Sequence, residues 1–275
     1  MSSFHEFNRR AWDRRARKRQ SFTRPASDEQ LRDPLAALDS RGWLEGSVAG
    51  KRVLCLAAGG GRQSALYAAA GAIVTVVDLS PEMLALDRQV AAERGYTIRV
   101  VQASMDDLSA LGDARFDLVA QPVSTCYVPS VARVYREVAR VIVDGGLYIS
   151  QHKQPASLQA EVRPSRRGYA LAEPYYRTGP LPPVEGSRHR EAGTREYLHR
   201  WEELIGELCR SGFVIEDLTE PFHAAADAEP GTFGHRSRFV APYVRIKARR
   251  CAGVAPVRRE ENAGQSPSLW TPEDP

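Results

Sequence analysis

Three consecutive glycines and a later aspartate are the residues of this chain whose spacing best suits a ligand. Gly59, Gly60 and Gly61 follow an apolar run over residues 51–57, and Asp78 stands seventeen residues beyond Gly61, at the end of a second apolar run. A glycine turn between a strand and a helix lets a ligand approach backbone N–H groups that a Cβ atom would block. A carboxylate ending the next strand can accept hydrogen bonds from both hydroxyls of a ribose. The pair predicts an adenosine-containing cofactor, whereas the alternative is a tight turn and a helix cap with no ligand.

The elements that must position these residues alternate between strands and helices. We expect strands over residues 51–57, 73–78, 97–102, 116–120 and 147–151, separated by helices that begin near residue 62 and span 82–94 and 131–142. Such alternation is typical of an α/β protein with a doubly wound, mostly parallel sheet. Ligands of these sheets bind at the carboxyl ends of the strands. A helix over 195–211 and two more strands, 213–218 and 239–247, follow.

The glycine turn resembles the first motif of the class I S-adenosylmethionine-dependent methyltransferases, and the resemblance extends over roughly residues 40 to 250. The family pattern is two hydrophobic residues, an acid, a hydrophobic residue and Gly-x-Gly-x-Gly, which residues 53–61 match at Gly59 and Gly61. Cys55 replaces the acid and Ala57 replaces the first glycine. The resemblance implies a seven-stranded sheet with an antiparallel last strand, and S-adenosylmethionine as the cofactor.

Further motifs of the family follow at the ends of later strands. Residues 76–84 resemble the ribose-binding motif, residues 103–108 resemble the third motif, and residues 116–124 and 144–147 continue the pattern. The resemblance implies that Leu79 and Met83 line the adenine and that Ser104 replaces an acid that often contacts its amino group. The implied cofactor-binding residues are Ala57, Gly59, Gly61, Asp78, Leu79, Met83, Ser104, Met105, Asp106 and Gln121.

Two other functions remain open on the sequence. A nicotinamide-dependent dehydrogenase would place its Gly-x-Gly-x-x-Gly fingerprint on Gly59, Gly61 and Ser64, and the serine breaks that pattern. The departures at Cys55 and Ala57 leave room for a protein that binds S-adenosylmethionine without turnover.

Methyl transfer requires an aligned acceptor and, for an alcohol or amide, a base that removes its proton. His152, just beyond the strand expected over 147–151, is the first candidate for that catalytic base because histidine titrates near neutrality. The alternative is a loop histidine bonded to backbone. Aromatic residues that could bind the acceptor are Trp12, Tyr127, Tyr175 and Tyr176, which could equally belong to the core. No histidine or cysteine spacing suggests a metal site.

The remaining composition bounds the class of protein. A length of 275 residues, 43% hydrophobic and 26% charged, is typical of a globular chain without a membrane span, which we expect to stay in the cytoplasm with reduced cysteines. The net charge of +4 is too small to indicate nucleic acid, although seven basic residues crowd residues 9–19. We therefore expect a small-molecule methyl acceptor as the partner, and the sequence does not define an oligomeric state.

The predicted organisation has three parts. Residues 1–40 form an N-terminal helical cap and residues 41–251 form the methyltransferase domain. Within that domain the Pro- and Gly-rich segment 152–194 is a cover over the substrate. Residues 252–275 form a disordered tail.

Overall fold

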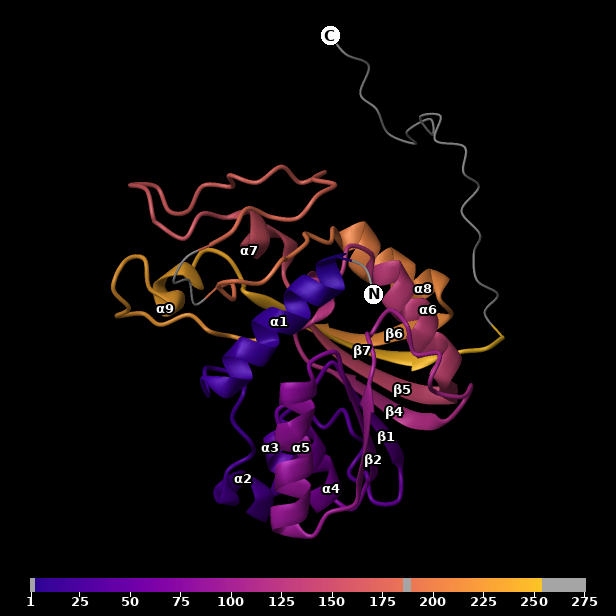
Figure 1. Ribbon diagram of the computed structural model, residues 1–275. Coiled ribbons are helices and arrows are strands. Elements are labelled where there is room, and N and C mark those ends of the chain that lie inside the picture. The colour runs from indigo at the N-terminus through magenta and orange to yellow at the C-terminus, as the bar shows by residue number, and fades with distance from the viewer. Residues whose placement is uncertain (1–2, 185–188, 254–275) are drawn as a thin grey trace.

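The computed structural model describes residues 3–184 and 189–253 of the chain and contains a seven-stranded sheet flanked by helices (Figure 1). The strand order is β3-β2-β1-β4-β5-β7-β6. Strands β1 to β5 pair in parallel, whereas β7 runs antiparallel to both β5 and β6. The strands are β1 (Arg52–Leu56), β2 (Ile73–Asp78), β3 (Ile98–Gln102), β4 (Phe116–Gln121), β5 (Ile142–Lys153), β6 (Phe213–Thr219) and β7 (Tyr243–Arg250). The predicted mostly parallel sheet with a reversed last strand is confirmed.

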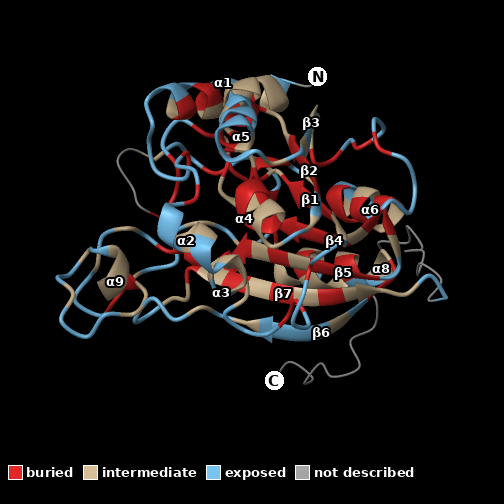
Figure 2. Cartoon of the chain, turned by 90° about the horizontal axis from the view of Figure 1, so that it is seen from below, coloured by how far each residue is buried: buried red, intermediate tan, exposed pale blue. Residues whose placement is uncertain are grey.

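Alternating side chains of the central strands divide the core into two layers. Leu54 and Leu56 of β1 face a cluster that includes residues of α6 (Val131–Val141) and α8 (Glu207–Arg210). Val53 and Cys55 face the opposite cluster, which includes Tyr67 of α4 (Gln63–Ala69) and Leu84 of α5 (Pro81–Arg94). This period of two, with both faces covered, is what a buried parallel strand requires. Figure 2 shows the buried residues concentrated in the central strands, with β6 exposed at the edge.

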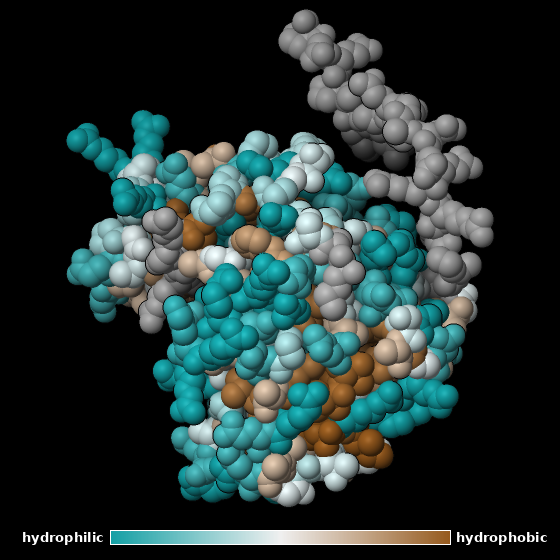
Figure 3. Space-filling view, viewed as in Figure 1, coloured by the Kyte–Doolittle hydropathy of each residue, from teal (hydrophilic) through white to brown (hydrophobic). Residues whose placement is uncertain are grey.

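Shorter elements complete the fold. They are α1 (Ser3–Arg17), α2 (Asp28–Arg32), α3 (Pro34–Leu38), the 3₁₀ turn η1 (Thr125–Tyr127), α7 (Pro155–Gln159), the π-helical turn η2 (Glu202–Gly206) and α9 (Phe233–Arg236). Helix α1 crosses above α5 in Figure 1, and hydrophilic side chains cover its outward side in Figure 3. It therefore lies near the carboxyl ends of the strands, where this fold class binds ligands.

Three expected boundaries were wrong. Strand β5 begins directly after α6 and passes through Gly145 and Gly146, because the register against β4 shifts between Phe116 and Leu118 and residues 143–146 bulge out. Residues 195–200 are not helical, since their backbone bonds to other segments. Strand β7 starts at Tyr243 and not at residue 239, because Pro242 has no N–H group to donate to a ladder.

The predicted three-part organisation stays a prediction, although its segments can be located. Helices α1, α2 and α3 lie within residues 1–40, and the predicted cover contains α7 and two isolated bridges, its first two residues belonging to β5. Of the predicted tail, residues 254–275 lie outside the described residues. None of the helices in the described ranges is long and apolar enough to cross a membrane.

Candidate cofactor and acceptor site

The glycine turn after β1 is held from beneath by α5. The N–H groups of Gly60 and Gly61 donate to the two carboxylate oxygens of Asp87, at 2.9 and 3.1 Å, and Ser64 Oγ donates to the same carboxylate. Burial raises the pKa of Asp87 to about 6. The sequence offered no signal for Asp87, because an acid inside a helix ordinarily marks a solvated face. These two N–H groups thus already donate to a carboxylate of the protein. The sequence predicted that a ligand would approach them, and the turn does not leave them free for one.

Ala57, at the place of the first family glycine, adopts a left-handed backbone with φ of +48°. That region is rarely occupied by residues with a Cβ atom. The turn therefore keeps the glycine conformation at this position although the glycine is missing. Cys55, which replaces the family acid, is fully buried in the apolar layer beneath. The Cys55 side chain therefore presents no surface to a ligand.

Asp78 ends β2 beside the turn. Its Oδ2 atom accepts from Gly59 N and its Oδ1 atom accepts from Ser80 N, both at 2.9 Å. Burial raises the pKa of this carboxyl to about 6, against the lowering effect of these amide donors. Each oxygen retains capacity for a second donor, so the carboxylate can still accept hydroxyl groups of a ribose.

The other predicted cofactor residues gather at the ends of β2, β3 and β4. Met83 is buried against the turn, where a Cβ atom on Gly59 would lie 2.8 Å from its Cβ atom. Gln121 Nε2 donates to Met105 Sδ at 3.2 Å, and Ser104 Oγ donates to Asp106. Leu79 is half-buried beside Asp78 and uses its carbonyl to accept from Gln102. These residues form one continuous rim along the sheet edge, and their cofactor roles remain predictions.

Helix α1 bonds to this rim at several points. His5 Nε2 lies 2.9 Å from Asp106 Oδ1, and Ser80 Oγ donates to Asp13 Oδ1 at 2.6 Å. Asn8 Nδ2 donates to the carbonyl oxygens of Tyr127 and Arg195, at 2.9 and 3.0 Å. The helix therefore covers the carboxyl ends of the strands from β2 to β4. The sequence predicted an N-terminal helical cap but not where it docks.

His152 lies inside the sheet and not beyond it. Strand β5 continues to Lys153, so the imidazole of His152 points into the core, where Thr125 Oγ1 and Ser150 Oγ lie 2.8 Å from its Nδ1 and Nε2 atoms. Burial lowers the pKa of this histidine to about 3. With both nitrogens engaged and the side chain 1% exposed, this geometry argues against a base that reaches an acceptor. It favours a role in holding η1.

The predicted acceptor-binding aromatics form two separate pairs. Trp12 meets Tyr127 edge-on, with ring centroids 5.6 Å apart. Tyr175 meets Tyr176 edge-on at 5.3 Å, and Tyr176 is 75% exposed. The first pair lies between α1 and the end of β4, beside the rim. The second pair contacts the residues around Trp201, where Tyr175 accepts from its N–H group.

Tyr127 also joins a buried ion cluster that sequence reasoning missed. Its hydroxyl donates to Glu191 Oε2 at 2.8 Å, and Lys153 Nζ donates to the same oxygen at 2.6 Å. Glu196 bonds both Lys153 and Arg190. Three of the four charged residues come from the chain after α7 and one from β5. The cluster thus ties that segment to the end of the sheet.

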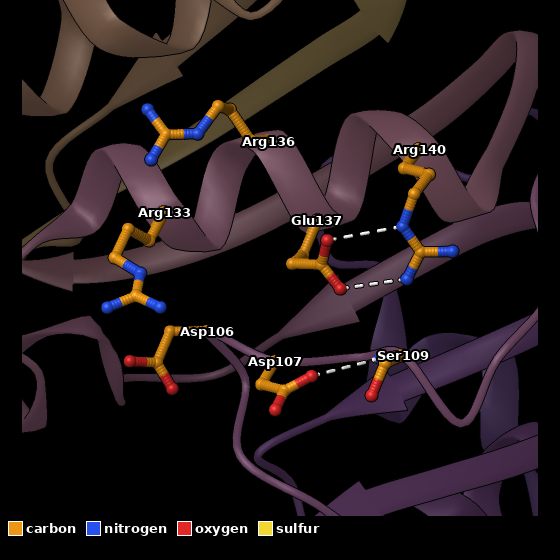
Figure 4. A pocket seen from close by; sticks show the side chains of 7 residues that line it. All are labelled: Asp106, Asp107, Ser109, Arg133, Arg136, Glu137 and Arg140. Carbon is orange, nitrogen blue, oxygen red and sulfur yellow. Dashed lines mark hydrogen bonds and ion pairs between the residues drawn. The ribbon is translucent and has the colours of Figure 1, made fainter. Parts of the chain in front are cut away.

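An open hollow of about 660 Å³ lies outside the rim, between α6 and the loop after β3 (Figure 4). Arg133, Glu137 and Arg140 face Asp106 and Asp107 across it, while Arg136 points away. Arg140 bonds Glu137 and Asp113. Because both acidic and basic side chains line the hollow, its charge favours neither an anion nor a cation as a ligand. Among the described residues, no three or more His, Cys, Asp or Glu side chains gather closely enough to hold a metal ion.

Comparison with known proteins identifies the family. A model of a methyltransferase domain matches residues 54–150. The uncharacterized methyltransferase YbaJ of Bacillus subtilis is 35% identical over 177 residues, which cover 63% of this chain and 69% of the relative. The chain belongs to the class I S-adenosylmethionine-dependent methyltransferases. Family membership makes it an enzyme with S-adenosylmethionine as its cofactor and decides against the dehydrogenase alternative.

Other relatives of this methyltransferase agree on the fold. A crystal structure of an S-adenosylmethionine-dependent methyltransferase from Mesorhizobium loti is 26% identical, with a TM-score of 0.60, and covers 80% of this chain and 100% of its own. A ubiquinone biosynthesis O-methyltransferase of Bordetella pertussis is 34% identical over 108 residues, 38% of this chain. That match spans only 45% of the relative. The family model, over residues 54–150, matches the chain from within β1 to within β5.

Proposed function

We propose that this methyltransferase transfers a methyl group from S-adenosylmethionine to a small-molecule acceptor by in-line displacement. The proposal rests on the geometry of Asp78. Two backbone N–H groups orient this carboxylate at the end of β2, where α1 covers the strand ends. The ribose hydroxyls would donate to this carboxylate, and Leu79, Met83 and Met105 would line the adenine. When bound, the cofactor supplies an electrophilic methyl group on its sulfonium.

The side chains of the enzyme must then align the acceptor with the methyl group and exclude water. The acceptor atom must lie about 3 Å from the methyl carbon, in line with the departing sulfur. We place the acceptor against the Trp12–Tyr127 ring pair, at the end of β4, with the ion cluster behind Tyr127 holding that ring in place. His152 supports η1 from within the core and is not assigned the base. An acceptor that is already ionised would need no base.

Titration calorimetry with S-adenosylhomocysteine, the product form of the cofactor, tests the cofactor site. Asp78→Ala should weaken binding by roughly 2 to 3 kcal/mol, or about thirty- to 150-fold, because two hydrogen bonds to a charged acceptor are lost. The exposed acid Asp227 provides a matched control, and Asp227→Ala should leave the Kd unchanged. An unchanged Kd in Asp78→Ala, or saturable binding of NAD, would place the ribose elsewhere.

Incubating the enzyme with a cell extract and S-adenosylmethionine labelled on its methyl carbon identifies the acceptor. Label should appear in a small molecule and depend on Asp78. Label found only in macromolecules would contradict the proposed acceptor class.

A further inference from the structure

Arg15 of α1 has surroundings that the cofactor site does not explain. Its Nε atom is buried and has no hydrogen-bond acceptor among the described residues. The centre of its guanidinium lies 5.4 Å from the centroid of the Trp12 ring. Leaving a buried N–H group without an acceptor costs about 1–3 kcal/mol, so an oxygen that the described residues do not supply would stabilise this position.

Several other arginines differ from Arg15 because a carboxylate of the chain pairs with them. On α1, Arg9 pairs with Glu6 and Asp13, Arg10 pairs with Glu6, and Arg17 pairs with Glu82. Two further arginines with a buried unpaired Nε atom, Arg177 and Arg210, each bond a carboxylate through another nitrogen. Arg15 has no such carboxylate among the described residues. Its charge is therefore available to a ligand anion.

Helix geometry directs Arg15 toward the acceptor side. At 3.6 residues per turn, Arg15 lies about 200° around the helix from Asp13, which bonds Ser80 on the ribose side. It lies within about 20° of Asn8, which holds Tyr127 and Arg195. Arg15 thus lies on the side of α1 that meets η1, two turns further along the helix than Asn8.

We propose that Arg15 binds a carboxylate of the methyl acceptor and that the acceptor is a planar anion. This inference rests on the proposed function and names its substrate class. Trp12 and Tyr127 supply aromatic surface, and the Tyr127 hydroxyl is already donated to Glu191, so that this residue offers its ring and not a polar group. The fork of N–H groups on Arg15 matches the two oxygens of a carboxylate.

The test uses the full chain saturated with S-adenosylhomocysteine and titrated with benzoate or benzamide, which share a ring and differ in charge. Benzoate should bind at least tenfold more tightly than benzamide to the wild type. Arg15→Gln should remove that preference, Arg15→Lys should retain part of it, and Arg14→Gln, on an exposed neighbour, should retain all of it. Equal binding of the two probes to the wild type, or an unchanged preference in Arg15→Gln, would overturn the proposal.

A second titration separates this result from the cofactor. S-adenosylhomocysteine carries a carboxylate of its own, and 5′-methylthioadenosine lacks the amino-acid portion. If Arg15→Gln weakens only the former by tenfold or more, the carboxylate belongs to the cofactor and the acceptor assignment is wrong. Equal affinities of wild type and Arg15→Gln for both would support the acceptor. Failure of the wild type to bind either molecule would contradict the proposed function itself.

Discussion

At the scale of single residues, the carboxyl group of Asp78 connects cofactor binding to pH. Burial raises its pKa to about 6, and only the ionised form can accept from both ribose hydroxyls. The Kd for S-adenosylhomocysteine should therefore rise as the pH falls below about 6, approaching tenfold per unit for a single proton. Calorimetry from about pH 5 to 8 checks this dependence, and Asp78→Asn should give a flat profile. An equally steep profile in Asp78→Asn would assign the proton to another group, such as Asp87.

The same raised pKa has the opposite effect on folding. Between the unfolded value of about 4 and the folded value of about 6, the native carboxyl holds a proton that the unfolded chain releases. The contribution of Asp78 to the free energy of unfolding therefore falls as the pH rises through this window and stays low above it. A bound cofactor would offset that loss.

Gly61 illustrates a residue whose type is demanded by packing and not by a ligand. Its φ is +76°, and an added Cβ atom would lie 3.0 Å from Leu86 O and 3.1 Å from Val90 Cγ1. Gly61→Ala should lower the free energy of unfolding by about 2–4 kcal/mol, since strain and overpacking add. Gly95 has a similar φ of +69° with nothing within 4 Å of an added Cβ.

Chemical denaturation of both variants gives the comparison. Gly95→Ala should cost only about 1 kcal/mol, the backbone strain alone. Equal destabilisation of the two variants would show that contacts with α5 do not matter. Full stability of Gly61→Ala with loss of cofactor binding would restore a purely ligand-directed role for the glycine.

The sequence predicted residues at strand ends better than residues whose partners are distant in the chain. The place of Asp78 follows from periodicity and spacing, because parallel strands place their carboxyl ends at one edge, whereas Met83 and Met105 came from the family resemblance. The position of His152 did not follow from the sequence, because pairing with β7 extends β5 through Lys153 and turns the imidazole inward. Pairing with a strand some ninety residues later leaves no local pattern.

At the scale of elements, Asn8 is one of the residues that attach α1 to the rest of the molecule. This side chain donates to Tyr127 O and Arg195 O and accepts from Arg195 N, at 2.7 to 3.0 Å. Asn8→Ala leaves those buried backbone groups unpaired and should increase hydrogen exchange within residues 3–17 by tenfold or more, while β1 and β4 stay protected. Arg10→Ala, on the exposed side of α1, serves as the control. Unchanged hydrogen exchange in Asn8→Ala would show that apolar packing alone holds α1 over the strand ends.

The position of α1 lay beyond sequence analysis for a similar reason. Seven basic residues crowd residues 9–19, and several of these cations pair with carboxylates at the surface. What the pattern did not contain is the identity of the partners, because Ser80, Asp106 and Arg195 come from three distant segments. Docking of a helix is decided by tertiary contacts that amphipathicity does not specify.

At the scale of the whole molecule, the ion cluster joins the sheet to the segment that follows α7. Lys153 lies between Glu191 and Glu196, and its side chain is 3% exposed. Lys153→Met removes the cation and leaves two buried carboxylates, so the free energy of unfolding should fall by about 3–5 kcal/mol. Lys247 of β7 offers a contrast, since it pairs with Glu216 at 3.0 Å nearer the solvent.

Lys247→Met should therefore cost no more than about 1 kcal/mol, as is usual for a pair near the surface. Denaturant unfolding of both variants measures the difference, and limited proteolysis shows where it acts. Cleavage after Lys153→Met should appear first near residues 189–196, because Glu191 and Glu196 lose their ion pairs with β5 while the parallel strands keep their attachments. If the two variants lose equal stability, or if cleavage begins elsewhere, the cluster does not hold the cover against the sheet.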